Sequence, residues 1–402
     1  MDFDISPEHR ALMAKVDGFV QDRLIPLEQD PKSFDEHENV REDLLQTLRA
    51  EVKAMGLFSP QMPKERGGLG LTPVGQALLY ERMNRSIFGP VCFNCAAPDD
   101  GNMTVLSKVA TKAQQDKWLD PIVDGRVRSA FVMTEPHPGG GSDPGMIHTR
   151  AEKKGDRWVV NGHKWFITGA GVASHFILIA KTGEGAKDGL TAFAFHRDDS
   201  GWEIIRRIPI MGPEEHGGHC ELKFDGLEIP DEHRLMGIGQ GLKLTQIRLG
   251  LARLTHCMRW LGLAQRCMEI AGSYVSERQG FGIKLADRES VQMQLGRVAM
   301  AIDTGRLLTM RAAWRLTQGQ KARPDISMAK IQVADTLHLA ADTAIQLCGA
   351  RGYSKDTILE WIYRYARQAR LVDGASEVHQ MVISRAYREQ GRNFFAWGPG
   401  SD

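Results

Sequence analysis

The spacing of apolar residues changes twice along the chain. In residues 1–125 apolar positions recur with helical spacing, and Leu12, Val16 and Phe19 share one face. From 126 to 235 apolar and polar residues alternate with a period of two, which is typical of strands. Residues 236–402 return to a period near four. The pattern predicts a mostly α-helical protein, in which a small β-domain lies between an N-terminal helical domain and a C-terminal helical bundle.

Individual elements follow from the same pattern. The middle domain is expected to contain strands over 176–180, 190–195 and 220–224. The bundle is expected to contain helices over 244–278, 291–317, 326–348 and 376–388.

The middle domain begins with a segment of mixed chemistry, residues 131–168. Asn161-Gly162 lies between two β-rich runs, and this dipeptide favours a type I′ hairpin turn. Hydroxyls, the flat ring of Phe166 and a glycine turn at 139–141 suit a planar ligand that carries polar edges and phosphates. Ordinary turn residues would give the same composition, so the residue types alone leave both interpretations open.

Charge and hydropathy exclude several classes of protein. The 402 residues carry 51 basic and 50 acidic side chains, so the net charge of +1 provides no general attraction for nucleic acid or anionic lipid. No apolar run approaches the roughly 18 residues that span a bilayer, and the start Met1-Asp2-Phe3-Asp4 is acidic where a signal peptide would be basic. We therefore expect a cytoplasmic protein without membrane insertion.

The spacing of the cysteines and histidines does not match a metal site. The six cysteines fit reduced core thiols better than a disulfide framework. Cys92 and Cys95 have zinc-like spacing without a second pair at metal-site distance, and His216 and His219 lack a nearby carboxylate ligand of the right pattern. No metal site is expected.

The motifs Met133-Thr134-Glu135-Pro136, Gly141-Ser142-Asp143 and Asn161-Gly162 resemble the flavin-binding middle domain of acyl-CoA dehydrogenases, and the resemblance extends over essentially the whole chain. It implies FAD as cofactor and the acyl-CoA dehydrogenase fold, with an N-terminal helical domain, a small β-barrel-like middle domain and a C-terminal four-helix bundle. The FAD contacts that it implies in the middle domain are Phe131, Met133, Thr134, Gly141, Ser142, Phe166 and Thr168.

The turn Asp373-Gly374 resembles the family's catalytic loop, where a carboxylate, usually glutamate, removes the α-proton of an acyl thioester. Asp373 is thus the expected catalytic base, although a plain turn into a helix capped by Ser376 would look the same. Asp-Gly followed by Glu-Val-His is similar to the subgroup that some animals fuse to a phosphotransferase-like domain. Ala252 stands where some relatives place an alternative base. The implied substrate contacts are Ser142, Leu249, Arg253, Val372 and Gly374.

Further FAD contacts are implied near the end of the first bundle helix and beyond it. Some resemble segments that a neighbouring subunit supplies, and for this reason we expect a homodimer or homotetramer. These contacts are Arg278, Phe281, Gln346, Gly349, Gly352, Ala375 and Glu377. The chain departs from the family at the apparent insertion His137-Pro138, at Glu289 in place of glutamine and at Ala375 in place of threonine.

The expected activity is α,β-dehydrogenation of an acyl-CoA in fatty acid β-oxidation, with electrons passed to electron-transferring flavoprotein. A flavin oxidase of the same fold, acting on nitroalkanes or acyl-CoA, is one alternative. A flavin-containing, nucleic-acid-binding stress protein is another, which the near-neutral charge disfavours.

Overall fold

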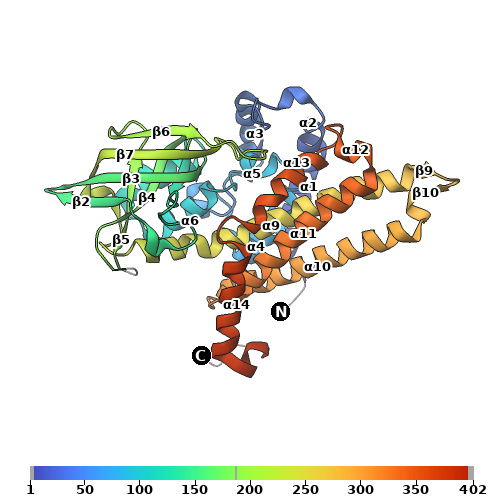
Figure 1. Ribbon diagram of the computed structural model, residues 1–402. Coiled ribbons are helices and arrows are strands. Elements are labelled where there is room, and N and C mark those ends of the chain that lie inside the picture. Colours follow the sequence, from blue (N-terminus) through green and yellow to red (C-terminus); the bar gives the residue numbers. More distant parts are fainter. Residues whose placement is uncertain (1–3, 186–187, 397–402) are drawn as a thin grey trace. The chain divides into compact units, whose positions relative to one another are not determined.

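The computed structural model describes residues 4–185 and 188–396 (Figure 1). The first three residues of the acidic amino terminus lie outside this range. Within the described part, no helix is both long and apolar enough to cross a bilayer. Two compact units emerge from the contacts: unit 1 comprises Met1–Gln29, Thr72–Gly89 and Arg253–Asp402, and unit 2 comprises Asp30–Leu71 and Pro90–Ala252.

Unit 1 is helical. Its longest helices pack as α10 against α11 and α14 against α11, while α4 contacts both α1 and α10 (Figure 1). Periodicity predicted the four long C-terminal helices to within a few residues at each end. The helices are α1 (Pro7–Phe19), α2 (Ile25–Leu27), α4 (Pro73–Met83), α9 (Gly241–Glu277, which begins in unit 2), α10 (Glu289–Thr317), α11 (Arg323–Cys348), α12 (Ala350–Tyr353), α13 (Leu359–Ala366) and α14 (Ser376–Gln390).

Unit 2 is built on one sheet. The strand order is β6-β7-β3-β2-β4-β5-β8, and β1 pairs with β4 in parallel. This path ends at β6 and β8, so the sheet is not closed. The strands are β1 (Arg128–Val132), β2 (Arg150–Lys154), β3 (Arg157–Thr168), β4 (Ala173–Lys181), β5 (Leu190–His196), β6 (Trp202–Arg207), β7 (His219–Pro230) and β8 (Arg234–Leu235).

Unit 2 also contains α3 (Glu42–Ala54), α6 (Asp99–Val109), α7 (Lys112–Gln114) and α8 (Asp120–Val123), and α5 (Gly89–Cys92) lies at the boundary of the two units. Strands β9 (Gln279–Gly280) and β10 (Ile283–Lys284) form a small hairpin between α9 and α10.

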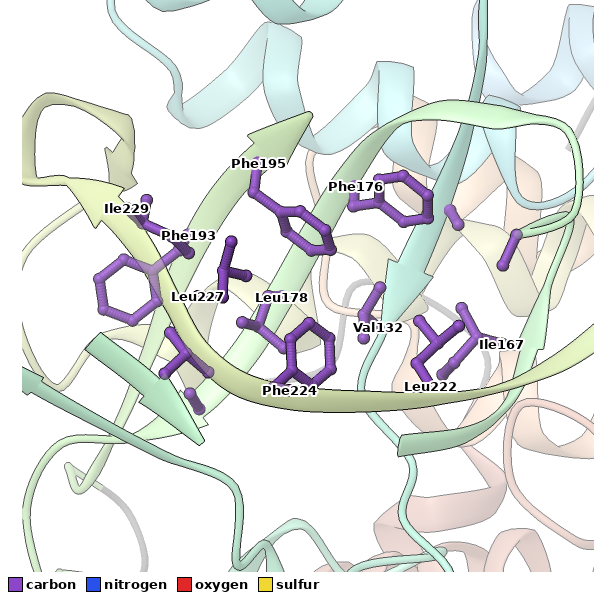
Figure 2. Close-up of a cluster of buried hydrophobic side chains, with 14 of the residues drawn as sticks. Val132, Ile167, Phe176, Leu178, Phe193, Phe195, Leu222, Phe224, Leu227 and Ile229 are labelled. Carbon is purple, nitrogen blue, oxygen red and sulfur yellow. The ribbon is translucent and has the colours of Figure 1, made fainter. Parts of the chain in front are cut away.

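Strand β4 is buried on both faces because alternate residues of the strand belong to two different clusters of buried apolar side chains. Phe176 and Leu178 belong to a cluster with Phe193, Phe195 and other residues of the sheet (Figure 2). The alternate residues Ile177 and Ile179 belong to a second cluster, which includes Met103 and Leu106 of α6. Successive side chains of a strand point to opposite faces, so a continuous apolar run can serve both cores.

The hairpin predicted at Asn161-Gly162 is wrong. Strand β3 continues through both residues, and the turn that joins it to β2 lies at Gly155-Asp156. Glycine is required at 162 for a different reason, because a Cβ atom there would collide with the side chain of Thr149.

The first strand ends earlier than its β-like sequence indicates. Strand β1 covers Arg128–Val132, and Met133 and Thr134 then leave the strand. The Thr134 carbonyl accepts a hydrogen bond from the Trp165 amide at 3.0 Å, and the Thr134 hydroxyl donates to the Trp165 carbonyl at 2.7 Å. Thr134 therefore remains tied to β3 beyond the end of the strand.

Candidate active site

The loop between α13 and α14 holds two residues with left-handed backbones. Asp373 has φ 54° and Gly374 has φ 100°. Most side chains disfavour positive φ, but aspartate is tolerated there and glycine is unrestricted. Backbone strain of this kind is concentrated at functional sites. The Asp373 carboxylate lies at this turn with 20% of its side chain exposed.

Two cations fix the backbone of this turn. Arg253 of α9 donates from Nε to the Asp373 carbonyl at 2.7 Å. Lys330 of α11 donates from Nζ to the Gly374 carbonyl at 2.9 Å, and its side chain is fully buried. Burial lowers the pKa of Lys330 to about 8. Burial also lowers the pKa of Arg253, against the attraction of Asp373. The structure thus brings the predicted residues Arg253, Asp373 and Gly374 together.

Two histidines flank the same turn. His256, one helical turn after Arg253, places Nε2 3.3 Å from Oδ2 of Asp373. His379 of α14 packs beside Gly374 and shares a 2.9 Å hydrogen bond with the Ser327 hydroxyl. Burial, aided by Arg253 and Lys330, lowers the pKa of His379 to about 4, which keeps this ring neutral at pH 7.

The N-terminus of α14 is uncapped. Ala375 occupies the cap position, and no side chain there accepts a hydrogen bond from the helix. The prediction that Ser376 caps the helix is therefore wrong. Ser376 is the first helical residue, and its hydroxyl is buried without a hydrogen-bond partner. The start of α14 thus offers unpaired donors next to the candidate base.

A buried ion pair braces the segment after β1. Lys164 of β3 donates to the Met133 carbonyl at 2.7 Å and to Glu135 at 2.9 Å. Glu135 also accepts the amides of His148 and Thr149. The ion pair joins Met133, β3 and the loop before β2.

Other predicted flavin contacts of the middle domain lie around β1 and β3. Phe166 has φ 51° at a register break between β3 and β7, and 43% of its side chain is exposed. The Thr168 hydroxyl contacts His219 Nδ1 at 3.0 Å. Phe131 lies under the Arg248 guanidinium, which is 4.2 Å from its ring centre. Gly141 and Ser142 are exposed.

The residues predicted to come from a neighbouring subunit are largely exposed. Arg278 lies beside the β9–β10 hairpin, where Phe281 is fully exposed. Gln346 is exposed near the end of α11, and Gly349 follows that helix with φ 58°. Gly352 is buried, and a Cβ atom there would press on Ile345.

The remaining predicted residues have varied surroundings. Leu249 and the buried Ala252 lie on α9, and Val372 is half-buried just before Asp373. Glu377 is exposed in the first turn of α14, and Glu289 is exposed at the start of α10.

The two pairs with spacing suggestive of a metal site, Cys92 with Cys95 and His216 with His219, do not lie in a cluster of metal-ligating side chains among the described residues. Cys92 and Cys95 are buried free thiols. His216 lies 3.3 Å from Glu42, while His219 contacts Thr168. Over residues 4–185 and 188–396, no three His, Cys, Asp or Glu side chains gather as metal ligands.

Sequence reasoning missed the parts played by His256 and Lys330. His256 has a weak signal, since it follows Arg253 by three residues and so shares its helix face. Lys330 lies in a largely apolar stretch of α11, where a lysine is unusual enough to suggest a buried role. Nothing local indicates that either residue contacts a loop more than 40 residues away along the chain.

Comparison with known proteins follows the same domain order. The acyl-CoA dehydrogenase N-terminal, middle and C-terminal domain models match residues 6–126, 130–227 and 239–387. "Probable acyl-CoA dehydrogenase FadE2" of Mycobacterium tuberculosis is 33% identical over 98% of this chain and 99% of its own. A solved Mycobacterium abscessus protein assigned to the acyl-CoA dehydrogenases is 32% identical, with a TM-score of 0.89 over 96% of this chain and all of that chain.

Some relatives are longer. Acyl-CoA dehydrogenase family member 11 of Gallus gallus is 33% identical over 94% of this chain, which spans only 50% of that relative. The expected fold class and enzyme class are confirmed, and the family is flavin-dependent. The chain belongs to the acyl-CoA dehydrogenase family, whose members are oxidoreductases.

Proposed function

We propose that the protein binds FAD and oxidises an acyl-CoA to its trans-2-enoyl-CoA, with Asp373 as the base that removes the α-proton. The observation that carries this proposal is the Asp373 turn. A partly exposed carboxylate is held on a strained backbone, which is fixed by Arg253 and Lys330 from two helices. A general base must be held within hydrogen-bond reach of the proton that it removes.

The residues around the turn fit a flavin. The uncapped start of α14 and the unpaired Ser376 hydroxyl provide donors that a bound polar group would satisfy. We propose that Ala375 and Glu377 meet the flavin there, and that Phe131, Met133, Thr134, Gly141, Ser142, Phe166 and Thr168 form its wall in the β-domain. When bound, FAD supplies the acceptor for the hydride that leaves the β-carbon.

The chain's own residues supply the proton chemistry. Asp373 accepts the α-proton, and the Asp373 amide can donate to the thioester oxygen on which negative charge develops. Val372, Gly374, Leu249, Ser142 and Arg253 are proposed to border the acyl thioester. Arg253 and Lys330 keep the turn from moving away from the substrate, because they fasten its two carbonyls.

The assembly is also part of this proposal. Phe281 is fully exposed at the hairpin tip, and Arg278 and Gln346 are exposed as well, as expected for residues that reach a second subunit. We propose that they, with Gly349 and Gly352, contact FAD across a homodimer or homotetramer, and that electron-transferring flavoprotein is the acceptor. The division at 1–125, 126–235 and 236–402 is proposed as the domain organisation.

The test is anaerobic. Acyl-CoAs of graded chain length and branching are added to the purified flavoprotein while the flavin absorbance is recorded. Bleaching by one class, with enoyl-CoA formed in equal amount, supports the proposal. Bleaching only by nitroalkanes, rapid oxygen consumption on re-aeration, or salt-dependent DNA binding without any bleaching would each replace it with a different function.

A further inference from the structure

We propose that His256 is a positioning residue that holds the Asp373 carboxylate, and that Arg259 sets the His256 tautomer needed for this. The inference rests on the proposed role of Asp373 as base. It concerns how that base is kept in place, which the backbone contacts of Arg253 and Lys330 do not settle.

Helix α9 contacts Asp373 twice. Arg253 holds its backbone carbonyl, and His256, three residues later, lies 3.3 Å from its carboxylate oxygen Oδ2. Residues three apart on a helix share a face. The backbone and the side chain of one residue are therefore held by one rigid element.

Two neighbouring side chains, Trp260 and Arg259, restrain the orientation of the His256 ring. The ring stacks on Trp260 with centroids 4.9 Å apart and an interplanar angle of 25°. Arg259 lies 3.3 Å from Nδ1 through its NH2 group. All three side chains are buried or nearly so, which restricts alternative rotamers.

The tautomer follows from the chemistry of arginine. A guanidinium has donors and no acceptor, so Nδ1 of His256 accepts from Arg259 and the ring carries its proton on Nε2. Nε2 is the atom that lies toward Asp373. An N–H donor at Nε2 favours the ionised carboxylate and limits its rotation.

This arrangement suits the shorter aspartate. Aspartate tolerates the left-handed backbone at 373, but it has one methylene fewer than the usual glutamate and a different reach. Displacements on the order of 1 Å can cost about 10²-fold in rate, so a side chain that fixes the carboxylate has a direct kinetic effect.

Several other charged or titratable groups surround the turn. Arg253 and His256 come from α9, Lys330 from α11, and Glu377 and His379 from α14. Cys257, next to His256, is buried and donates to the Arg253 carbonyl. Arg253 and Lys330 donate hydrogen bonds to backbone carbonyls of the turn. Replacing His256 therefore removes a donor to the Asp373 carboxylate and leaves these two cations in place.

The experiment follows flavin reduction by the acyl-CoA that bleaches the parent, as a function of pH and substrate concentration. Leucine in His256→Leu removes the donor. Glutamine in His256→Gln can return an N–H close to the position of Nε2. The matched control is His338→Leu, which removes a histidine of α11 that packs on Tyr363.

We expect His256→Leu to reduce the limiting rate by about 10-fold or more. The acid limb of its pH–rate profile should move to higher pH, because a carboxylate that loses a donor is protonated more readily. The half-saturating substrate concentration should change by less than about twofold, since binding is not the altered step. His256→Gln should recover most of the rate and the parental limb, and His338→Leu should change neither.

A His256→Leu profile that superimposes on the parent overturns the inference, and so does a His256→Gln enzyme as slow as His256→Leu. If His256→Leu does not retain flavin, the test uses Arg259→Gln instead. This variant removes the contact that fixes the His256 tautomer, so the acid limb of its pH–rate profile should also move to higher pH. An acid limb of Arg259→Gln at the parental pH overturns the inference too. Asp373→Asn, run in parallel, keeps the two hypotheses apart: full activity in that variant refutes the base itself, whereas an inactive Asp373→Asn beside an unaltered His256→Leu refutes only the positioning role.

Discussion

Replacing Lys164 by methionine should strongly destabilise the β-domain. The ammonium group is fully buried and bonded to the Met133 carbonyl and to Glu135. Methionine has a similar length but leaves the Glu135 carboxylate, 4% exposed, without a cation beside it, although the amides of His148 and Thr149 still donate to it. Removing one partner of a buried ion pair costs about 3–5 kcal/mol, and we expect a loss of this size.

The assay is urea unfolding followed by tryptophan fluorescence, because Trp158 and Trp165 flank Lys164 on the same strand. The double variant Glu135→Gln/Lys164→Met removes both charges and should be about 2 kcal/mol more stable than Lys164→Met alone. The exposed Lys153→Met is the control and should stay within about 0.5 kcal/mol of the parent. A Lys164→Met protein within about 1 kcal/mol of the parent would refute the reasoning.

The stability of the single variant Glu135→Gln, relative to that of the parent, should depend on pH. Burial lowers the pKa of Lys164 from its usual value, and Glu135 opposes this shift. Without the carboxylate, the unfolded chain binds more protons than the folded chain at alkaline pH, so stability rises with pH. The deficit of Glu135→Gln relative to the parent should therefore shrink between about pH 7 and pH 9. A deficit that is constant over this range would show that Lys164 keeps its proton.

Three further predictions concern stability. Ala375→Thr supplies the missing cap of α14 and should raise the free energy of unfolding by about 1 kcal/mol; a lower melting temperature would contradict this. Gly162→Ala should lower the free energy of unfolding by about 1–3 kcal/mol, because the added methyl group collides with Thr149. Thr149→Gly in the same chain should recover part of this loss. Gly141→Ala, whose methyl group would meet no atom within 4 Å, serves as control. The pKa of His379 is about 4 in the fold against 6.5 ordinarily, so its contribution to stability should be lost as pH falls from 6.5 toward 4, and His379→Gln should have a flatter acid melting profile than the parent.

Periodicity predicted the fold well where one face of a long element is apolar. Helix α10 was expected over 291–317 and spans Glu289–Thr317. Turn signals were less reliable. Asn161-Gly162 has the residues of a hairpin turn, but in the fold Gly162 gives room to Thr149, a neighbour in space. Such close approaches arise from tertiary packing and leave no local pattern.

The site was predicted unevenly for a related reason. Resemblance to a family motif pointed to the Asp373 turn and to Arg253, and the structure places these two residues in contact, while their roles remain predictions. The side chains that hold the turn come from positions 44 to 120 residues away, and their contacts depend on how α9, α11 and α14 pack. Ser376 shows the same limit, since a shift of one residue in the helix start moves the cap to Ala375.

The most direct test of the account is the reduction of flavin by acyl-CoA in Asp373→Asn, measured anaerobically beside the parent. Asparagine keeps the shape of the side chain and tolerates the left-handed backbone, but it cannot accept the proton. We predict that the variant binds flavin and acyl-CoA as the parent does, and that its reduction is slower by at least about 10²-fold. Reduction at the parental rate would contradict the assignment of Asp373 as the base.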